Sequence, residues 1–585
     1  MIRRYLRPEL ALLCFGLTMK LLGSVAELVI PMLLADMLDE VVPTGNRRAI
    51  WLQGGLMLLF ALLALVGNIV ANQNSARVSS RVTRRIRHDL FTRTLHLSQH
   101  QVDRIGIPSL ETRLTSDTYH VHQMISRLQR LGVRAPILLL GGLAFTVALD
   151  PVLALSLIVL LPFMGIAIYL IARRGRPLYN QLQANVDLLT RRVRETVTGI
   201  RIIRALVTER SERARFAGVN QTVSASERRA AYNMALTNPL MTLLLNIGLA
   251  LVLLIGAWRI NRGLMEFGVI IAFLTYFTII TSSMIAVTRI FAIYNRGISS
   301  AERIEEILTL PDEDENMPGS SAVAEGDACT PAAIEFRDVS FSYDGKHDQL
   351  EEISFRLEAG QTLGIIGPTG SGKSTLLLLL LGLYPDYRGE IYLDGRENRS
   401  WTRRERAELF GVTFQNDFLY RDSIRQNVGF ARQVAEEDIV RAVADARASD
   451  FVAEKSGGLD FELGVRAANL SGGQRQRLLI ARALATRPRI LILDDASSAL
   501  DYRTDAELRQ ALREHYAGAT SVIVAQRISS IQHADLILLI ENGRIAASGS
   551  HAELLVNSPA YREIAASQMG VGVAAPQMGA AGGTS

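Results

Sequence analysis

The sequence predicts a membrane α-helical domain followed by an α/β domain that contains a phosphate-binding loop. Long uncharged apolar runs recur through residues 1–300, whereas short β-rich runs alternate with helical patterns from Ala333 onward. A glycine-rich loop at Gly367–Ser374 stands between a β-rich run and a helical run, which is the place that such a loop takes in its fold. Mean hydropathy is +0.18 although 21% of the residues are charged, so the apolar residues must be concentrated in one part of the chain.

The first domain, residues 1–310, is predicted to cross the membrane six times. A bilayer core of about 30 Å needs a helix of about 20 apolar residues. The longest apolar run, residues 135–172, would overshoot that thickness as a single helix, and the turn signal Asp150-Pro151 divides it in two. The predicted spans are residues 8–34, 50–71, 135–149, 151–172, 239–260 and 267–291.

The distribution of arginine predicts how these spans are oriented. Two long segments between spans, residues 72–134 and 173–238, are rich in Arg, whereas the opposite loops are short. Because basic residues collect on the cytoplasmic side, we expect both segments to be cytoplasmic extensions of the membrane helices and both termini to be cytoplasmic. All but four of the 63 basic residues are Arg, a bias typical of GC-rich genomes, so the expected location is a bacterial cell (inner) membrane.

Composition also excludes several classes of protein. Two cysteines, Cys14 and Cys329, cannot form a disulfide framework. The Arg residues flank apolar segments instead of forming one basic face, which argues against nucleic-acid binding. The expected boundaries after the membrane domain are a linker over residues 311–332, an α/β domain with a largely parallel sheet over 333–566, and a disordered Gly- and Ala-rich tail over 567–585.

The phosphate-loop pattern G-x-x-x-x-G-K-[ST] predicts an ATP site with Mg²⁺. Its glycines let backbone N–H groups converge on phosphate oxygens, Lys373 reaches the β- and γ-phosphates, and Ser374 can ligate magnesium. The buried β-rich run at residues 490–493 leads into Asp494, the expected Walker B carboxylate on the metal. The residues of the loop and its first helical turn are Gly367, Pro368, Thr369, Gly370, Ser371, Gly372, Lys373, Ser374 and Thr375.

Between the loop and Asp494 stands the sequence Leu-Ser-Gly-Gly-Gln, and this order of motifs resembles an ATP-binding cassette. Six spans ahead of one cassette resemble the half-transporters of the ABC exporter type, and the resemblance covers nearly the whole chain. It implies that Tyr343 stacks on adenine, that Gln415 contacts magnesium, and that Ser498 and Asp501 belong to the D-loop. The signature residues are Leu470, Ser471, Gly472, Gly473 and Gln474.

The same resemblance implies a dimer, because in this family the signature of one cassette completes the ATP site of the other. Two positions depart from the family pattern. Asp495 stands where a catalytic Glu is usual, and its carboxylate is withdrawn by about 1.5 Å, the length of one C–C bond. Gln526 stands where a His is usual, and an amide cannot carry a proton. Together they resemble the degenerate subunit of a heterodimeric exporter, whose own ATP site turns over slowly.

The expected function is therefore ATP-driven export of an amphipathic compound, lipid or peptide by a heterodimer. Three alternatives remain open: a slow symmetric homodimer, an importer of the same fold such as those that carry siderophores inward, and an ATP-gated regulator or channel. No nucleic-acid partner is expected.

The resemblance also suggests which segments transmit movement and which line the pathway. Residues 111–117 and 198–205 resemble the two short cytoplasmic segments that contact the cassettes. Lys20 and Glu27 share one helix face inside the first span, where charges are costly and face a cavity or a partner. Whether they pair for structure or line the pathway stays open, and Ser282, Ser283 and Tyr276 are weaker pathway candidates.

Overall fold

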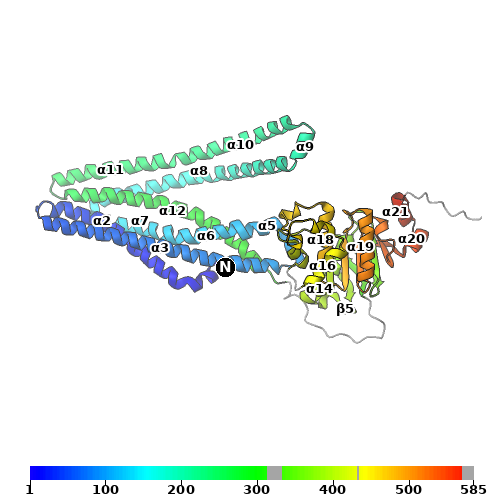
Figure 1. The fold of residues 1–585 in the computed structure, drawn as a ribbon. Helices are drawn as coiled ribbons and strands as arrows, with labels where there is room; N and C mark the ends of the chain where they lie inside the picture. The colour runs from blue at the N-terminus through cyan, green and yellow to red at the C-terminus, as the bar shows by residue number, and fades with distance from the viewer. Residues whose placement is uncertain (313–332, 431–433, 570–585) are drawn as a thin grey trace, which may run out of the picture. The chain divides into compact units, whose positions relative to one another are not determined.

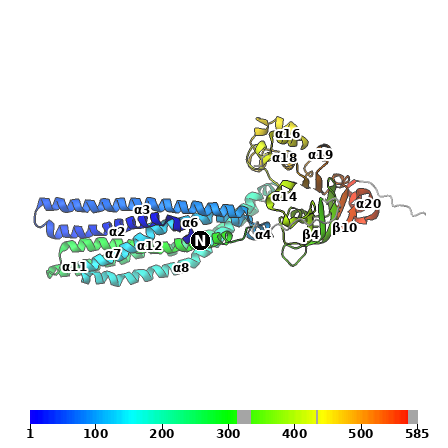
Figure 2. The ribbon, with the colours of Figure 1, turned by 90° about the horizontal axis from the view of Figure 1, so that it is seen from below.

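The computed structural model describes residues 1–312, 333–430 and 434–569, which form two compact units. The membrane unit comprises residues 1–95 and 106–310. The second unit comprises residues 96–105 and the described residues from 311 onward, so a short piece of the first half of the sequence belongs with the cassette. Figure 1 and Figure 2 show the ribbon of each unit.

The membrane unit is helical throughout, and six helical stretches in it are long and apolar enough to cross a membrane. Each predicted span falls inside one of its long helices, the first of them together with the 3₁₀ turn that precedes α2. The helices are α1 (Ile2–Leu6), α2 (Leu10–Asp36), α3 (Arg47–Leu95), α5 (Ile107–Thr112), α6 (Thr118–Arg127), α7 (Val133–Leu149), α8 (Pro151–Thr198), α9 (Ile200–Ala205), α10 (Glu209–Ala235), α11 (Thr237–Asn261) and α12 (Phe267–Leu308).

The predicted turn between the third and fourth spans is confirmed. Asp150 has extended backbone angles, and its Oδ1 accepts hydrogen bonds from the backbone N–H groups of Val152 (2.9 Å) and Leu153 (3.0 Å). Pro151 occupies the first position of α8, where its missing N–H is not needed. The carboxylate also pairs with Arg259 of α11 at 2.9 Å, so this turn ties three helices together.

The Arg-rich segments continue the membrane helices, as expected. Helix α3 has 49 residues and α8 has 48, so each is far longer than a bilayer requires. Helix α10 runs beside α8, and the short helix α9 joins them at the tip (Figure 1). The apolar side chains at this tip are exposed, among them Ile202 and Val207.

The cassette contains a parallel sheet core, as the sequence predicts, and also a separate antiparallel sheet. The larger sheet has the order β10-β9-β3-β8-β7-β6, in which the order β9-β3-β8-β7-β6 is parallel and β10 is antiparallel. The smaller sheet has the order β2-β1-β4-β5. The strands are β1 (Ile334–Phe341), β2 (Leu350–Leu357), β3 (Thr362–Ile366), β4 (Arg388–Leu393), β5 (Arg396–Glu397), β6 (Phe410–Thr413), β7 (Ile490–Asp494), β8 (Thr520–Val524), β9 (Leu536–Glu541) and β10 (Arg544–Gly549).

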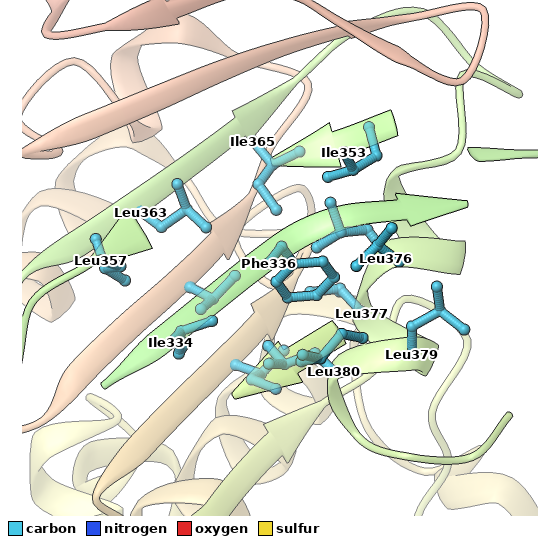
Figure 3. Close-up of a cluster of buried hydrophobic side chains, with 14 of the residues drawn as sticks. Ile334, Phe336, Ile353, Leu357, Leu363, Ile365, Leu376, Leu377, Leu379 and Leu380 are labelled. Carbon is cyan, nitrogen blue, oxygen red and sulfur yellow. The ribbon is translucent and has the colours of Figure 1, made fainter. Parts of the chain in front are cut away.

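Helices cover these sheets, and one apolar core joins them to α13, the helix that follows the phosphate loop. Phe336 of β1, Leu363 of β3 and Leu376 of α13 all lie in this core (Figure 3). The core therefore fixes the loop between β3 and α13 at both of its ends. The cassette helices are α4 (Gln99–Ile105), α13 (Lys373–Leu380), α14 (Arg403–Leu409), α15 (Ile424–Gly429), α16 (Glu436–Asp445), α17 (Ser449–Ala453), α18 (Gly472–Leu484), α19 (Tyr502–His515), α20 (His551–Asn557) and α21 (Pro559–Met569).

Helix α21 corrects one predicted boundary. It continues to Met569, so the expected tail at residues 567–585 begins inside a helix. The residues of that tail from 570 onward and residues 313–332 of the expected linker lie outside the described residues.

Candidate functional site

The phosphate loop has the strand–loop–helix setting that the sequence predicts. Gly370 and Gly372 adopt φ angles of 83° and 105°, which residues with a Cβ rarely take. A Cβ on Gly367 would lie 2.1 Å from the carbonyl oxygen of Ile540, so the loop passes too close to β9 for any side chain there. The glycines are therefore required by this backbone as well as by the phosphates that it would hold.

Within the loop, several polar groups are held ready for phosphate oxygens. The Nζ of Lys373 donates to the backbone carbonyls of Gly367 (2.9 Å) and Pro368 (2.7 Å). Burial lowers the pKa of Lys373, and a phosphate would reverse that shift. The hydroxyl oxygen of Ser371 is buried and has no hydrogen-bond partner among the described residues. A buried hydroxyl without a partner is costly, so a phosphate oxygen would stabilise this loop.

Asp494 ends β7 and lies beside the loop. Only 6% of the residue is exposed, and burial raises the pKa of its carboxyl group. Together with the Ser374 hydroxyl and the Gln415 amide it forms a set of oxygen donors suited to Mg²⁺. No cluster of three or more His, Cys, Asp or Glu in the described chain could hold a metal ion alone. A cation at this site would therefore share its coordination with nucleotide phosphates and water, as Mg²⁺ usually does.

The two departures from the family pattern lie in contact with each other. Asp495 follows β7 with a positive φ of 50°, and its Oδ2 accepts hydrogen bonds from the amide nitrogens of Gln526 (3.0 Å) and Gln415 (3.3 Å). Burial raises the pKa of Asp495, while the Gln415 hydrogen bond opposes that shift. Gln415 and Gln526, selected from separate motifs, thus converge on one carboxylate oxygen of Asp495, which is held by their two neutral amides.

Tyr343 packs on the first turn of the loop helix, where a stacking aromatic is expected. Its hydroxyl donates to the Oγ1 of Thr375 at 3.2 Å, and its ring makes edge contacts with Phe341 and Tyr384. The residue is 40% exposed, which leaves part of the ring for a base.

The signature lies at the N-terminus of α18. Ser471 and Gln474 form a reciprocal capping box, in which the Gln474 backbone N–H donates to the Ser471 hydroxyl (3.3 Å) and the Ser471 backbone N–H donates to the Gln474 side chain (3.1 Å). A Cβ on Gly472 would meet no atom within 4 Å, so this terminus is open on that side. In the D-loop, the Ser498 hydroxyl donates to the Asp495 carbonyl, and Asp501 caps α19.

One residue of this region, Gln568 of α21, belongs to none of the predicted motifs. Its side-chain oxygen accepts from the backbone N–H of Ile528 (2.8 Å), and its amide nitrogen donates to the backbone carbonyl of Gln526 (2.8 Å). Gln568 thus holds the segment that carries Gln526 on both sides. It lies among residues predicted as disordered tail, and the apolar spacing of Tyr561 and Ala565 is the signal that could have extended the helix.

Residues 111–117, predicted as the first cassette-contacting segment, group with the membrane unit, as do residues 198–205, predicted as the second. Residues 111–117 end α5 and form a π-helical turn. The segment that packs in the cassette unit is α4, in which Asp103 accepts a hydrogen bond from the Tyr384 hydroxyl. Gly106, which adopts a φ of 81° after α4, and Pro108, in the first turn of α5, are the residues that mark the end of this short helix in the sequence.

In the membrane unit, the two charged pathway candidates, Lys20 and Glu27, have different surroundings. Lys20 is 4% exposed, and its Nζ donates to the side-chain oxygens of Asn68 (2.8 Å) and Asn72 (3.3 Å), so it ties α2 to α3. Glu27 pairs with Arg134 of α7 and lines a cavity. Tyr276 is buried and donates to the Leu28 carbonyl at 2.5 Å, which is a structural role, whereas Ser282 and Ser283 line the same cavity as Glu27.

Comparison with known proteins agrees with both units. Residues 13–284 match the model of the ABC transporter transmembrane region, and residues 350–498 match that of the ABC transporter. The chain is 32% identical over 573 residues to an uncharacterized ABC transporter ATP-binding protein of Mycobacterium tuberculosis, covering 97% of this chain and 98% of the relative. This chain belongs to the ABC transporters.

Another relative of this ABC transporter, an uncharacterized ABC transporter ATP-binding protein of Bacillus subtilis, is 31% identical and also matches over nearly the full length of both chains. Among solved structures, a bacterial Atm1-family ABC exporter with ATP bound superposes with a TM-score of 0.79 at 24% identity. That match covers 94% of this chain and 98% of the other, and it shows that the fold is the exporter-type fusion of a membrane domain with one cassette.

Proposed function

We propose that this ABC transporter chain is one half of a heterodimeric exporter, and that its own ATP site binds MgATP but hydrolyses it slowly. The observation that carries the proposal is the Asp495 carboxylate, which is short and is held by the amides of Gln415 and Gln526. A base that is displaced by about 1 Å can lose on the order of 10²-fold in rate. A neutral amide at position 526 also supplies no proton and no positive charge to the γ-phosphate.

The rest of the loop favours strong binding of the nucleotide. On arrival of ATP, the Nζ of Lys373 exchanges two backbone carbonyls for phosphate oxygens, and the Ser371 hydroxyl gains an acceptor. Ser374, Gln415 and Asp494 would hold Mg²⁺, which neutralises phosphate charge. Binding and slow hydrolysis at this site are therefore compatible, because different side chains control them.

A second half-transporter is supported by surfaces that this chain leaves uncovered. Ser471 has no hydrogen bond to the phosphate loop in the described part of its own chain, so its helix N-terminus is available to a partner's γ-phosphate. The cassette also has a groove of about 470 Å³ lined by aromatic side chains such as Phe414 and Phe418. We propose that the partner's cytoplasmic tip fills this groove and that the partner's cassette covers the exposed tip at α9.

In this proposal the chain is a multi-pass protein of the bacterial cell membrane with both termini in the cytoplasm, and the substrate is amphipathic. ATP binding closes the two cassettes and opens the cavity outward, and hydrolysis at the partner's site resets it. Importer and ATP-gated channel functions are tested by flux in inside-out vesicles. Uptake into such vesicles that requires hydrolysis supports export, efflux supports import, and flux without hydrolysis supports a channel.

The asymmetry is tested on the purified heterodimer. Asp495→Asn is expected to retain at least about half of the ATPase rate, because little turnover depends on this site. Changing the partner's glutamate at the equivalent position to glutamine should lower the rate on the order of 10²–10⁴-fold, the usual contribution of a positioned base. Collapse of activity in Asp495→Asn would instead support a symmetric pair, including the slow homodimer. The double variant Asp495→Glu with Gln526→His is expected to raise turnover if the partner's signature is intact.

A further inference from the structure

A cavity of about 260 Å³ lies between α2, α7 and α12 in the membrane unit. Leu138 of α7 and Ile279 of α12 form part of its apolar wall, and Thr278 and Ser282 of α12 contribute hydroxyl groups. Glu27 of α2 and Arg134 of α7 supply one charge of each sign. The volume is below the range of about 300–1,000 Å³ usual for drug-sized ligands, so it suits a small polar group better than a whole substrate. We call this space the headgroup cavity.

The ion pair in this cavity leaves hydrogen-bond donors of Arg134 unused. One guanidinium nitrogen, the Nη2 of Arg134, makes both bonds to Glu27, at 2.7 Å to Oε1 and 2.9 Å to Oε2. The Nε of Arg134 is buried and has no hydrogen-bond partner among the described residues. Because a guanidinium has five N–H donors, most of its capacity remains for another acceptor.

The side chains of this ion pair are also partly exposed, whereas the side chain of Lys20 is buried. The Glu27 side chain is 29% exposed and that of Arg134 is 38% exposed, whereas Lys20 is buried and held by two asparagines. Glu27 lies nine residues before the end of α2 at Asp36, about 13 Å along the helix and thus inside the apolar span. Charges at that depth that face a cavity usually mark a substrate pathway.

We propose that the headgroup cavity binds the zwitterionic headgroup of an amphipathic substrate, with an ammonium group against Glu27 and a phosphate or carboxylate group against Arg134. A purely anionic headgroup would meet the charge of Glu27, and a purely cationic one would meet the charge of Arg134. A zwitterion replaces the Glu27–Arg134 ion pair with two ion pairs to its own charged groups, and it adds no net charge to the cavity. The inference rests on the proposed transport function and specifies the substrate class.

The test measures binding of three fluorescent amphiphiles to the purified full-length chain in neutral detergent micelles, without nucleotide. The probes share one labelled acyl chain and differ in headgroup: lysophosphatidylethanolamine, lysophosphatidic acid and a primary amine. The zwitterionic probe is expected to bind up to about fivefold more tightly than each of the other two, the range expected for partly exposed ion pairs. Equal affinity for the three probes would overturn the proposal.

Charge variants make the assignment specific. Glu27→Gln is expected to shift the preference to the anionic probe, and Arg134→Gln to the cationic probe. The exchange Glu27→Arg with Arg134→Glu should restore the preference for the zwitterion, which a merely structural ion pair would not require. Arg262→Gln, in the turn between α11 and α12, is the matched control and should leave the preference unchanged. Unchanged preferences in both single variants would contradict the proposal.

A further variant covers the case in which Glu27→Gln does not fold. Leu138→Trp narrows the cavity with its charges intact, and it is expected to weaken binding of the zwitterionic probe. Undiminished binding in that variant would place the headgroup elsewhere. Competition identifies the natural source: displacement of the probe by free glycerophosphoethanolamine or dialanine supports a small zwitterion, and displacement by zwitterionic amphiphiles alone supports a lipid. None of these measurements uses ATP or the partner subunit, so their failure would leave the ATPase asymmetry test unaffected.

Discussion

Gln568 illustrates how a residue outside every nucleotide-binding motif can control one of them. Its side chain bonds the backbone on both sides of Arg527, and the neighbouring Gln526 side chain in turn bonds Asp495. Helix α21 is therefore connected through three hydrogen bonds to the Asp495 carboxylate. Each such bond contributes about 0.5–1.5 kcal/mol, so loss of the first two should be measurable.

We predict that Gln568→Ala weakens nucleotide retention at this chain's own site by about three- to tenfold, the equivalent of one or two hydrogen bonds. Photo-labelling of each subunit with azido-ATP measures this site separately from the partner's. Gln568→Glu keeps the acceptor for the Ile528 N–H and loses the donor to Gln526, so an intermediate effect is expected. Glu563→Ala on the exposed side of the same helix is the control. Unchanged labelling in Gln568→Ala would remove any positioning role.

At this scale, sequence reasoning selected the residues and left their partners unknown. The loop, Asp494, Gln415 and the departures at 495 and 526 are recognisable because they stand in short local patterns. The contacts of Gln568 and the pairing of Glu27 with Arg134 join residues 42 and 107 positions apart, respectively. Such contacts depend on how helices pack, and no local pattern records them.

At the scale of secondary-structure elements, the turn at Asp150 connects helices that the membrane alone would not fix. The same carboxylate caps α8 and pairs with Arg259 of α11. Asp150→Ala is expected to lower the free energy of unfolding by about 1–2 kcal/mol because the helix cap is lost. A further loss is expected because Arg259 would remain largely buried without its carboxylate partner. Asp150→Asn keeps a capping oxygen and loses the charge, so its stability should lie between those of wild type and Asp150→Ala. Thermal unfolding in detergent micelles orders the three proteins, and equal midpoints for Ala and Asn would refute the capping role.

The N-terminus of α18 allows a direct test of whether the signature of this chain serves the ATP site of a partner subunit. Ser471→Arg places a bulky cation on the open end of the signature helix, so we predict almost complete loss of ATPase activity in the heterodimer. The loss should occur although this chain's own site is the slow one, because the signature serves the partner's site. Ser471→Ala removes only the capping box, worth about 1 kcal/mol, and should retain most activity. Activity within about twofold of wild type in Ser471→Arg would show that this signature is not used.

Periodicity and Asp-Pro predicted the helices and their breaks well, because apolar length and turn chemistry are local properties. The antiparallel sheet of β1, β2, β4 and β5 was not predicted, since its strands lie on either side of the phosphate loop in sequence and no local pattern records their pairing. The position of α4 was missed for a related reason. Its assignment to the cassette depends on a contact with Tyr384, 281 residues further along the chain.

For the whole molecule, the exposed tip at α9 is the feature that a single chain leaves unexplained. Ile202 is 65% exposed and Val207 is 78% exposed at this tip, where α9 joins α8 to α10. We predict that Ile202→Glu lowers coupling, so that substrate flux falls several-fold more than ATPase activity, because a buried charge at the contact is costly. Arg201→Glu, which changes charge at a polar position of the same tip, is the control. Equal effects of the two variants would show that apolar contact at the tip is unimportant.

Helix α3 has a mechanical consequence for the assembly. Its 49 residues contain no proline and make one unbroken rod about 74 Å long, whereas α8 of nearly equal length contains Pro162 and Pro177. A stiff rod acts as a lever: a tilt of about 5° at one end carries the other end by about 6 Å, roughly the pitch of one helical turn. Proline removes a backbone hydrogen bond inside α8, so α8 is expected to bend more easily than α3. A small tilt of α3 would thus become a displacement of several ångströms at its far end without any helix having to unwind.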